Sequence, residues 1–197
     1  MLRLADWAQE KGIRLILDES FADFADEADN TFIRQDLLDR YRRLYVVKSI
    51  SKSYGVPGLR LGVLASGDQD LIAALKKDVA IWNINSFAEF YMQIEEKYKK
   101  DYARSLELIR AERARFRREL EKLPNLRVIP SQANYLMVEL LGGLSDRAIT
   151  RELLVNRCIL VKDLSPKLGG QQYLRLAVRD TRDNDRLLEA LRPLCGA

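Results

Sequence analysis

The chain has 197 residues, of which 47% are apolar and 31% charged, a balance typical of a folded globular protein rather than a disordered one. Its 33 basic and 29 acidic residues are mixed along the sequence and leave a formal charge of +4, so we expect no nucleic-acid partner. The chain has no histidine, which excludes Ser-His-Asp triads, histidine general bases and the commonest metal ligand, and we predict no metal site.

The two cysteines, Cys158 and Cys195, match neither a metal-ligand spacing nor a dense disulfide framework, which fits a reducing compartment. No apolar run approaches the roughly 20 residues that span a bilayer, and residues 1–20 lack the pattern of a signal peptide. We therefore expect a cytoplasmic protein with no membrane partner.

The first hundred residues predict strands that alternate with helices. Residues 2–11 place apolar side chains at helical spacing, and a buried strand follows that ends at Asp18. Charged groups at the carboxyl end of an α/β strand lie where such sheets bind ligands, so Asp18 is a candidate site residue from its position alone. The predicted strands span residues 13–17, 44–47 and 59–65, and the alternation indicates a parallel or mostly parallel sheet.

The remaining residues predict a long helix and then a small α+β domain. A short helix over 70–80 is followed by a helical pattern over 86–123 without a break, which ends at Pro124. Because such a helix often spans two domains, we place a boundary inside it and predict domains 1–104 and 105–197. Beyond the helix, strands are predicted at 126–129, 134–140, 159–162 and 173–178, and helices at 145–156 and 181–194.

The most informative segment is residues 49–62, SISKSYGVPGLRLG. It places Lys52 just beyond a strand among small and hydroxylated residues, with Arg60 at the start of the next strand. An amine that can form a Schiff base, together with hydroxyls and a guanidinium, suits an aldehyde cofactor that carries a phosphate. The alternative is a solvent-exposed loop with an ordinary lysine, which the whole pattern disfavours.

This segment resembles the S-x-S-K-x-x-G-x-x-G-x-R-x-G motif of the class I/II aminotransferases of pyridoxal-phosphate (PLP) fold type I. The chain is most similar to the histidinol-phosphate aminotransferase and threonine-phosphate decarboxylase group, over essentially its whole length. The resemblance implies an α/β fold: a partial PLP-binding large domain with a mostly parallel sheet, then a small C-terminal α+β domain. It also implies that Lys52 is the Schiff-base lysine and that Ser49, Ser51 and Arg60 contact the cofactor phosphate.

Upstream, LILDESFADF resembles the family's strand that ends in D-E-A-Y or D-E-A-F. The resemblance implies that Asp18 pairs with the pyridinium nitrogen, where a carboxylate keeps the ring protonated and able to accept electrons. The alternative is that Asp18 only caps the next helix. Phe21 also belongs to the expected cofactor site, and it departs from the tyrosine of many aminotransferases because it has no hydroxyl to donate.

Two C-terminal segments extend the resemblance. PSQANYL at residues 130–136 is similar to the family's P-S-x-A/T-N-F/Y-L stretch, and YLRL at 173–176 to its L-R-I segment. By this match Arg175 binds the substrate α-carboxylate, for which a planar two-pronged donor is well suited, and Asn134 supports the site. The alternatives are that Arg175 is a surface arginine, or that the nearby Arg179 is the true match.

The leading hypothesis is that the parent protein transfers an amino group between an amino acid and a 2-oxo acid through PLP, and acts as a homodimer. Lys52 would hold the cofactor and move the α-proton. The second hypothesis replaces transamination with decarboxylation of a phosphorylated amino acid, and the third is a non-catalytic module. The family's N-terminal half has no counterpart here, so we expect a truncated fragment that binds PLP weakly and has little activity alone.

Overall fold

The computed structural model describes residues 1–27, 31–170 and 172–196. The chain divides into two compact units, Met1–Arg104 and Ser105–Ala197. Each unit contains its own sheet, one of three strands and one of four. The chain is thus an α/β protein, as the sequence predicts, with the site residues of its motifs distributed over both units.

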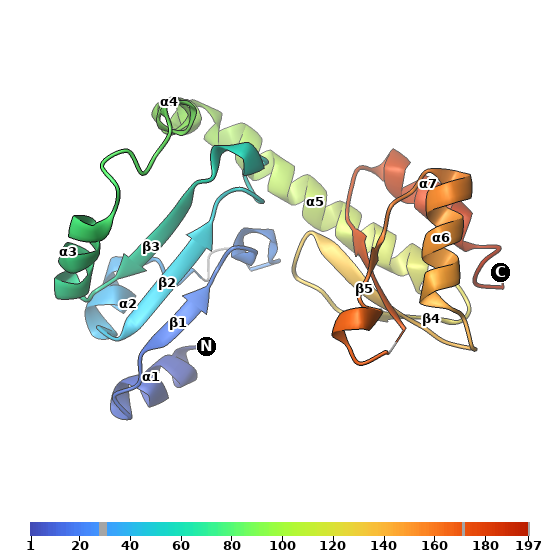
Figure 1. Cartoon of the computed structure of the whole chain (residues 1–197), viewed down its shortest axis with the longest axis horizontal. Coiled ribbons are helices and arrows are strands. Elements are labelled where there is room, and N and C mark those ends of the chain that lie inside the picture. Colours follow the sequence, from blue (N-terminus) through green and yellow to red (C-terminus); the bar gives the residue numbers. More distant parts are fainter. Residues whose placement is uncertain (28–30, 171, 197) are drawn as a thin grey trace. The chain divides into compact units, whose positions relative to one another are not determined.

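The first unit is built on a three-stranded sheet in the order β1-β2-β3 (Figure 1). Strand β1 (Leu15–Asp18) pairs in parallel with β2 (Leu44–Ser49), and β2 pairs in antiparallel fashion with β3 (Gly62–Ser66). The buried residues that pack together on this sheet are Ala5, Phe32, Tyr41, Leu44 and Val46. The helices are α1 (Leu2–Glu10), α2 (Gln35–Arg40), α3 (Gln69–Asp78) and α4 (Ser86–Ile94).

The direction of β3 differs from the mostly parallel sheet that the sequence predicts. The connection from β2 to β3 contains only the short 3-10 turn Pro57–Leu59. A strand that returns in parallel is usually preceded by a crossover α-helix, and the connection over residues 50–61 contains no α-helix. The 3-10 turn and the left-handed backbone of Arg60 (φ 57°) also delay the start of β3 beyond the predicted residue 59.

The predicted uninterrupted helix over 86–123 is wrong, because α4 and α5 (Lys99–Leu120) are separated by the 3-10 turn Glu95–Tyr98. Neither glycine nor proline lies in this turn, so residue propensity gives no signal for the break. Short 3-10 stretches commonly link helices, and their tighter winding shifts the face that the following helix presents. The six-residue α2 was also not predicted.

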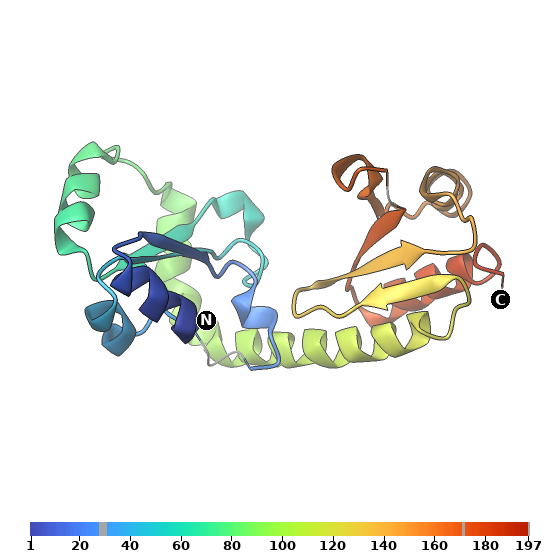
Figure 2. The ribbon, with the colours of Figure 1, turned by 90° about the horizontal axis from the view of Figure 1, so that it is seen from below.

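The second unit is an antiparallel sheet of order β4-β5-β7-β6. Along β5 and β7 buried and more exposed side chains alternate, so one face of the sheet is apolar. This face shares one hydrophobic core with α5, α6 and α7, and Figure 2 shows the second half of α5 and α7 running along the sheet. The elements are β4 (Leu126–Ile129), β5 (Tyr135–Leu140), α6 (Asp146–Arg157), β6 (Lys162–Asp163), β7 (Tyr173–Ala177) and α7 (Thr181–Leu191).

The two cysteines occupy different environments in this unit. Cys158 follows α6 in a left-handed conformation (φ 54°) and is exposed. Cys195 is fully buried in the core, and this burial raises the pKa of its thiol to about 11. Both are free thiols.

Candidate cofactor site

The parallel pairing of β1 with β2 brings the main motif residues to one edge of the first sheet. Asp18 is the last residue of β1 and is opposite Val47 in β2, whose last residue is Ser49. Parallel neighbours end at the same edge, which is where sheets of this class bind ligands. Asp18 and the turn that carries Lys52 therefore leave the sheet side by side.

Asp18 is an exposed carboxylate that is held in its charged form. Its Oδ1 accepts a hydrogen bond from the backbone N–H of Ser20 at 2.8 Å. Hydrogen bonds from Ser20 lower the pKa of the Asp18 carboxyl, with a further contribution from the charge of Lys52, and they outweigh the opposing effect of burial. The 3-10 turn that follows begins after Phe21 and not after Asp18, so Asp18 is not the capping residue of that turn.

Lys52 extends over the ring of Phe21. Its Nζ lies 4.8 Å from the ring centroid, a cation–π distance, and the side chain is exposed. The amine and the ring therefore lie together, as the motif matches predict. Since the ring carries no hydroxyl, the residue contributes a hydrophobic and electrostatic surface instead of a hydrogen-bond donor.

Three hydroxyls gather at the ends of β1 and β2. The Oγ atoms of Ser49 and Ser51 lie 2.5 Å apart, and the Ser20 hydroxyl accepts the backbone N–H of Ser49 at 3.0 Å. Arg60 is hydrogen-bonded within its own turn: its Nη1 donates to the carbonyl of Pro57 at 3.2 Å, and among the described residues no hydrogen bond joins it to the serines. The structure thus links the hydroxyls of the expected phosphate site by hydrogen bonds, whereas the guanidinium of Arg60 is hydrogen-bonded to Pro57 instead.

Several supporting residues were missed by the sequence analysis. Glu19 is 5% exposed and accepts hydrogen bonds from the hydroxyl of Thr31 at 2.7 Å and the backbone N–H of Phe32 at 2.6 Å, which holds these two residues at the end of β1. Lys48, four residues before Lys52, forms an ion pair with Asp23. The available signal was a lysine inside the otherwise apolar strand LYVVK, which needs a partner when it is buried.

In the second unit, Arg175 lies on the solvent-facing side of β7. Its guanidinium carbon lies 5.2 Å from the ring centroid of Tyr135 in β5. Asn134 precedes β5, and its backbone carbonyl accepts the N–H of Val178 at 2.9 Å, so its established contact is structural. The buried Arg113 donates to the carbonyls of Gln132 and Ala133, at 3.0 and 3.1 Å, and fixes the loop before Asn134.

The register of β6 and β7 adds a second cation beside Arg175. Lys162 is the cross-strand partner of Arg175, and both residues are exposed. Side chains of directly opposed residues point to the same face of a sheet, about 4.5–5.5 Å apart at Cβ. The sequence analysis missed Lys162 because only strand pairing, and not the sequence, shows which residue faces Arg175.

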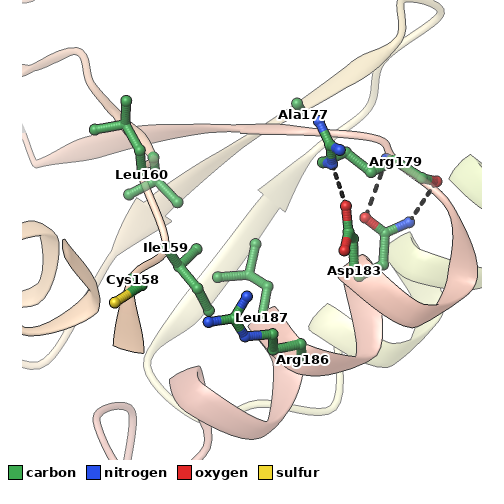
Figure 3. A pocket seen from close by; sticks show the side chains of 10 residues that line it. Cys158, Ile159, Leu160, Ala177, Arg179, Asp183, Arg186 and Leu187 are labelled. Carbon is green, nitrogen blue, oxygen red and sulfur yellow. Dashed lines mark hydrogen bonds and ion pairs between the residues drawn. The ribbon is translucent and has the colours of Figure 1, made fainter. Parts of the chain in front are cut away.

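Arg179 is engaged elsewhere. Its Nε pairs with a carboxylate oxygen of Asp183, and its backbone N–H donates to Oδ1 of Asn184 at 3.1 Å. Arg179 and Asp183 line one side of a pocket of about 300 Å³, whose other side is formed by Cys158 and its neighbours (Figure 3). Arg175 is not among the lining residues. The ion pair favours Arg175 over Arg179 as the arginine that is available to a ligand.

Similarity to known proteins identifies the family of this chain. Residues 1–191 match the family model described as aminotransferase class I and II. The chain belongs to the class I and II aminotransferase family. It is 33% identical to L-serine phosphate decarboxylase of Sulfurospirillum multivorans, over 92% of this chain and 47% of that protein. It is also 36% identical to CMP-5'-(3-aminopropyl)phosphonate synthase of Streptomyces rubellomurinus, over 98% of this chain and 31% of that protein.

Solved structures confirm the fold type I architecture. The histidinol-phosphate aminotransferase of Clostridium acetobutylicum superimposes with a TM-score of 0.87 at 28% identity, over 98% of this chain and 57% of that one. The chain thus spans between 31% and 57% of the length of these proteins. Among the described residues, no helix combines the length and the apolar character needed to cross a bilayer.

The family assignment confirms PLP as the cofactor. The residues at the sheet edge fit this group: an exposed amine, an ionised carboxylate and three clustered hydroxyls match an aldehyde, a ring nitrogen and a phosphate. Bound PLP supplies an electron sink for the bonds at a substrate α-carbon. The described residues contain no cluster of histidine, cysteine or carboxylate side chains that could hold a metal ion.

Proposed function

We propose that the whole protein of which this chain forms part decarboxylates an amino acid that carries a phosphate or phosphonate group, with PLP as cofactor. The observation that carries the proposal is the pair of exposed cations Arg175 and Lys162 on adjacent strands. The names of two relatives more than 30% identical, L-serine phosphate decarboxylase and threonine-phosphate decarboxylase, support it. The transaminase hypothesis becomes the second candidate.

Two like charges directly opposite each other destabilise a sheet, so their placement calls for a compensating anion. Arg175 offers a planar guanidinium, which suits a carboxylate, whereas Lys162 offers a compact ammonium, which binds phosphate as a point charge. A substrate with an α-carboxylate and a second anionic group would satisfy both residues. An amino acid with only one anionic group would leave one cation without a partner.

The roles proposed for the first unit follow from its geometry. Lys52 holds the cofactor and then moves a proton at the substrate α-carbon, and Asp18 keeps the ring nitrogen protonated. Ser49 and Ser51 donate to the cofactor phosphate, and Arg60 contributes the N–H donors that its hydrogen bond to Pro57 leaves available. Phe21 packs against the amine of Lys52. Because its side chain has no hydroxyl, it would donate no hydrogen bond to the phenolic oxygen of the cofactor.

Transamination between an amino acid and a 2-oxo acid remains the second candidate, because relatives include the histidinol-phosphate aminotransferase of Thermoanaerobacter pseudethanolicus, at 28% identity. For either reaction we propose that the whole protein is a homodimer. Product analysis separates the two reactions: decarboxylation releases carbon dioxide and leaves an amine, whereas transamination yields a 2-oxo acid.

We expect the whole protein, supplied with PLP and O-phosphorylated serine or threonine, to release carbon dioxide. Lys52→Ala should lower turnover by about 10²–10⁴-fold, since it removes the proton-transferring group. Lys162→Met should raise KM about 10–100-fold for the phosphorylated amino acid, which reflects the loss of one charge-assisted contact of about 1.5–3 kcal/mol.

The matched control is Lys167→Met, which removes an exposed lysine from the turn after β6 and should leave KM unchanged. A 2-oxo acid as the main product would favour transamination over the proposal. Peptide mapping after borohydride reduction should place the label on Lys52, and failure of the whole protein to take up PLP would instead support the non-catalytic module.

A further inference from the structure

A partly buried ion pair lies close in sequence to the turn that carries Lys52. Nζ of Lys48 lies 2.5 Å from Oδ1 of Asp23, and the two side chains are only 16% and 15% exposed. Tyr102 donates its hydroxyl to the other carboxylate oxygen of Asp23 at 2.8 Å. Burial raises the pKa of the Asp23 carboxyl, but the hydrogen bonds that it accepts outweigh this effect and hold the pKa below its usual value.

The three residues come from segments far apart in the sequence. Asp23 follows Phe21 by two residues, Lys48 lies in β2 shortly before Lys52, and Tyr102 belongs to the first turn of α5. The ion pair therefore links the turn that carries the Phe21 ring to the strand that leads into the lysine turn. It sets the spacing between the two groups whose contact places the amine, since Nζ of Lys52 lies over that ring.

A second contact holds the lysine turn from its other side. The ring of Tyr54, two residues after Lys52, stacks on Tyr102 with centroids 4.1 Å apart and planes inclined by 12°. Ser53, which lies between Lys52 and Tyr54 in the sequence, is buried beside both Asp23 and Tyr102. The turn is thus anchored before Lys52 by an ion pair and after it by an aromatic stack, and both anchors meet at one tyrosine.

We propose that Asp23, Lys48 and Tyr102 are positioning residues that fix the amine of Lys52 for its attack on the cofactor aldehyde. The inference rests on the proposed role of Lys52. Attack on a carbonyl requires alignment of the reacting atoms, and a displacement of about 1 Å can lower the rate by about 10²-fold. An exposed lysine on a loop acquires that alignment only from the residues that hold the loop.

The test uses the whole protein prepared without cofactor and then mixed with PLP. Two readouts apply: the rate at which the lysine captures PLP, followed by absorbance, and the visible circular dichroism of the bound cofactor, which reports how its ring is held. Asp23→Asn and Lys48→Met should slow capture about 10–100-fold and weaken the dichroic band. Lys48→Arg, which retains the charge, should restore both readouts to within about threefold of the unaltered protein.

Tyr102→Phe keeps the stacked ring and removes only the hydroxyl, so it should produce a smaller loss of the same kind and remain folded. Its matched control is Tyr98→Phe, at a tyrosine in the preceding turn that is 56% exposed, which should change neither readout. If Asp23→Asn, Lys48→Met and Tyr102→Phe lower the melting temperature yet leave the capture rate and the dichroic band unchanged below it, the cluster is merely structural and the inference is overturned.

Lys52→Ala separates this inference from the proposed function. Loss of capture in Lys52→Ala together with normal capture in the cluster variants would overturn the positioning role alone. Undiminished capture in Lys52→Ala would show that another lysine holds the cofactor, which would overturn the assignment of Lys52 and the positioning role with it.

Discussion

The two units of the chain differ in how well each one buries its own apolar residues. In the second unit, Phe116, Leu136 and Leu153 come from two helices and the sheet, are all 0% exposed, and belong to one continuous core. In the first unit the core is confined to a few residues around Val46 and Leu44. The unit that carries Lys52, the proposed Schiff-base lysine, is therefore the one with the smaller core.

The same contrast is visible at the surface. Between α3 and the end of α4 the first unit exposes large apolar side chains, among them Ile81 at 92%, Trp82 at 91% and Phe87 at 80%. Apolar patches of this kind mark surfaces that normally contact another part of a protein. We therefore expect the second unit to fold without further contacts, and the sheet that carries the cofactor motif to need contacts that its own unit does not provide.

The largest expected effect comes from separating the units. Residues 105–197 expressed alone should unfold cooperatively on heating, because their core is enclosed by three helices and a four-stranded sheet. Residues 1–104 alone should associate or bind a hydrophobic dye, because their exposed apolar surface and open sheet edges remain uncovered. Calorimetry and sedimentation of the two fragments measure the contrast, and a cooperative, monomeric 1–104 fragment would abolish it.

A core substitution in the second unit should have the next largest effect. Phe116→Ala removes a fully buried ring and should lower the free energy of unfolding of residues 105–197 by about 3–5 kcal/mol. Leu160→Ala is the control, since Leu160 is 81% exposed and its loss should change that free energy by no more than about 0.5 kcal/mol. Urea titration provides the measurement, and equal effects of the two changes would contradict an enclosed core.

The smallest expected effect is a dependence on pH. Burial raises the pKa of Glu112, but hydrogen bonds from Arg115, Asn184 and Thr181 outweigh it, so the pKa lies below its ordinary value of 4.5. The resulting stabilisation is complete above the unfolded pKa and is lost as the pH falls through the folded one. In urea titrations of residues 105–197 below pH 5, Glu112→Gln should flatten the acid-induced loss of stability.

The difference between wild type and Glu112→Gln should vanish at the lowest pH, where the wild-type carboxyl is protonated. A matched control is Glu107→Gln, which neutralises an exposed carboxylate on the same helix and should retain the wild-type slope. An unchanged slope in Glu112→Gln would show that the network around Asn184 does not stabilise the folded unit through charge.

Much of the fold could be predicted from the periodic spacing of apolar residues and from the glycine and proline residues that end helices. The predicted strand at 126–129 has the bounds found for β4, and the helices predicted from residues 2, 70 and 145 begin within one residue of those observed. The direction of β3 and the break before α5 were not predictable in this way. Both depend on which partner a segment meets in space, and neither glycine nor proline marks the break.

The residues of the candidate site likewise fall into those that local sequence motifs predict and those that only contacts in space reveal. Lys52 and Phe21 could be predicted because each belongs to a recognisable motif, residues 49–62 and LILDESFADF, and the structure places the amine over the ring. Lys162 and Tyr102 were not predicted, because the roles proposed for them depend on strand register and on a contact across 79 residues of sequence. The motif also predicts a phosphate contact for Arg60, but it does not predict that the guanidinium donates a hydrogen bond to Pro57 in its own turn.

Because Cys158 is exposed and Cys195 is buried, labelling of the two thiols can report on unfolding of the second unit. An alkylating reagent reacts with thiolates and needs access to sulfur, so near neutral pH it should modify Cys158 in the native chain. Cys195 is sealed in the core and its pKa is raised to about 11, so it becomes reactive only when that core opens. Incorporation of a second label therefore counts opening events of the small domain without any engineered probe.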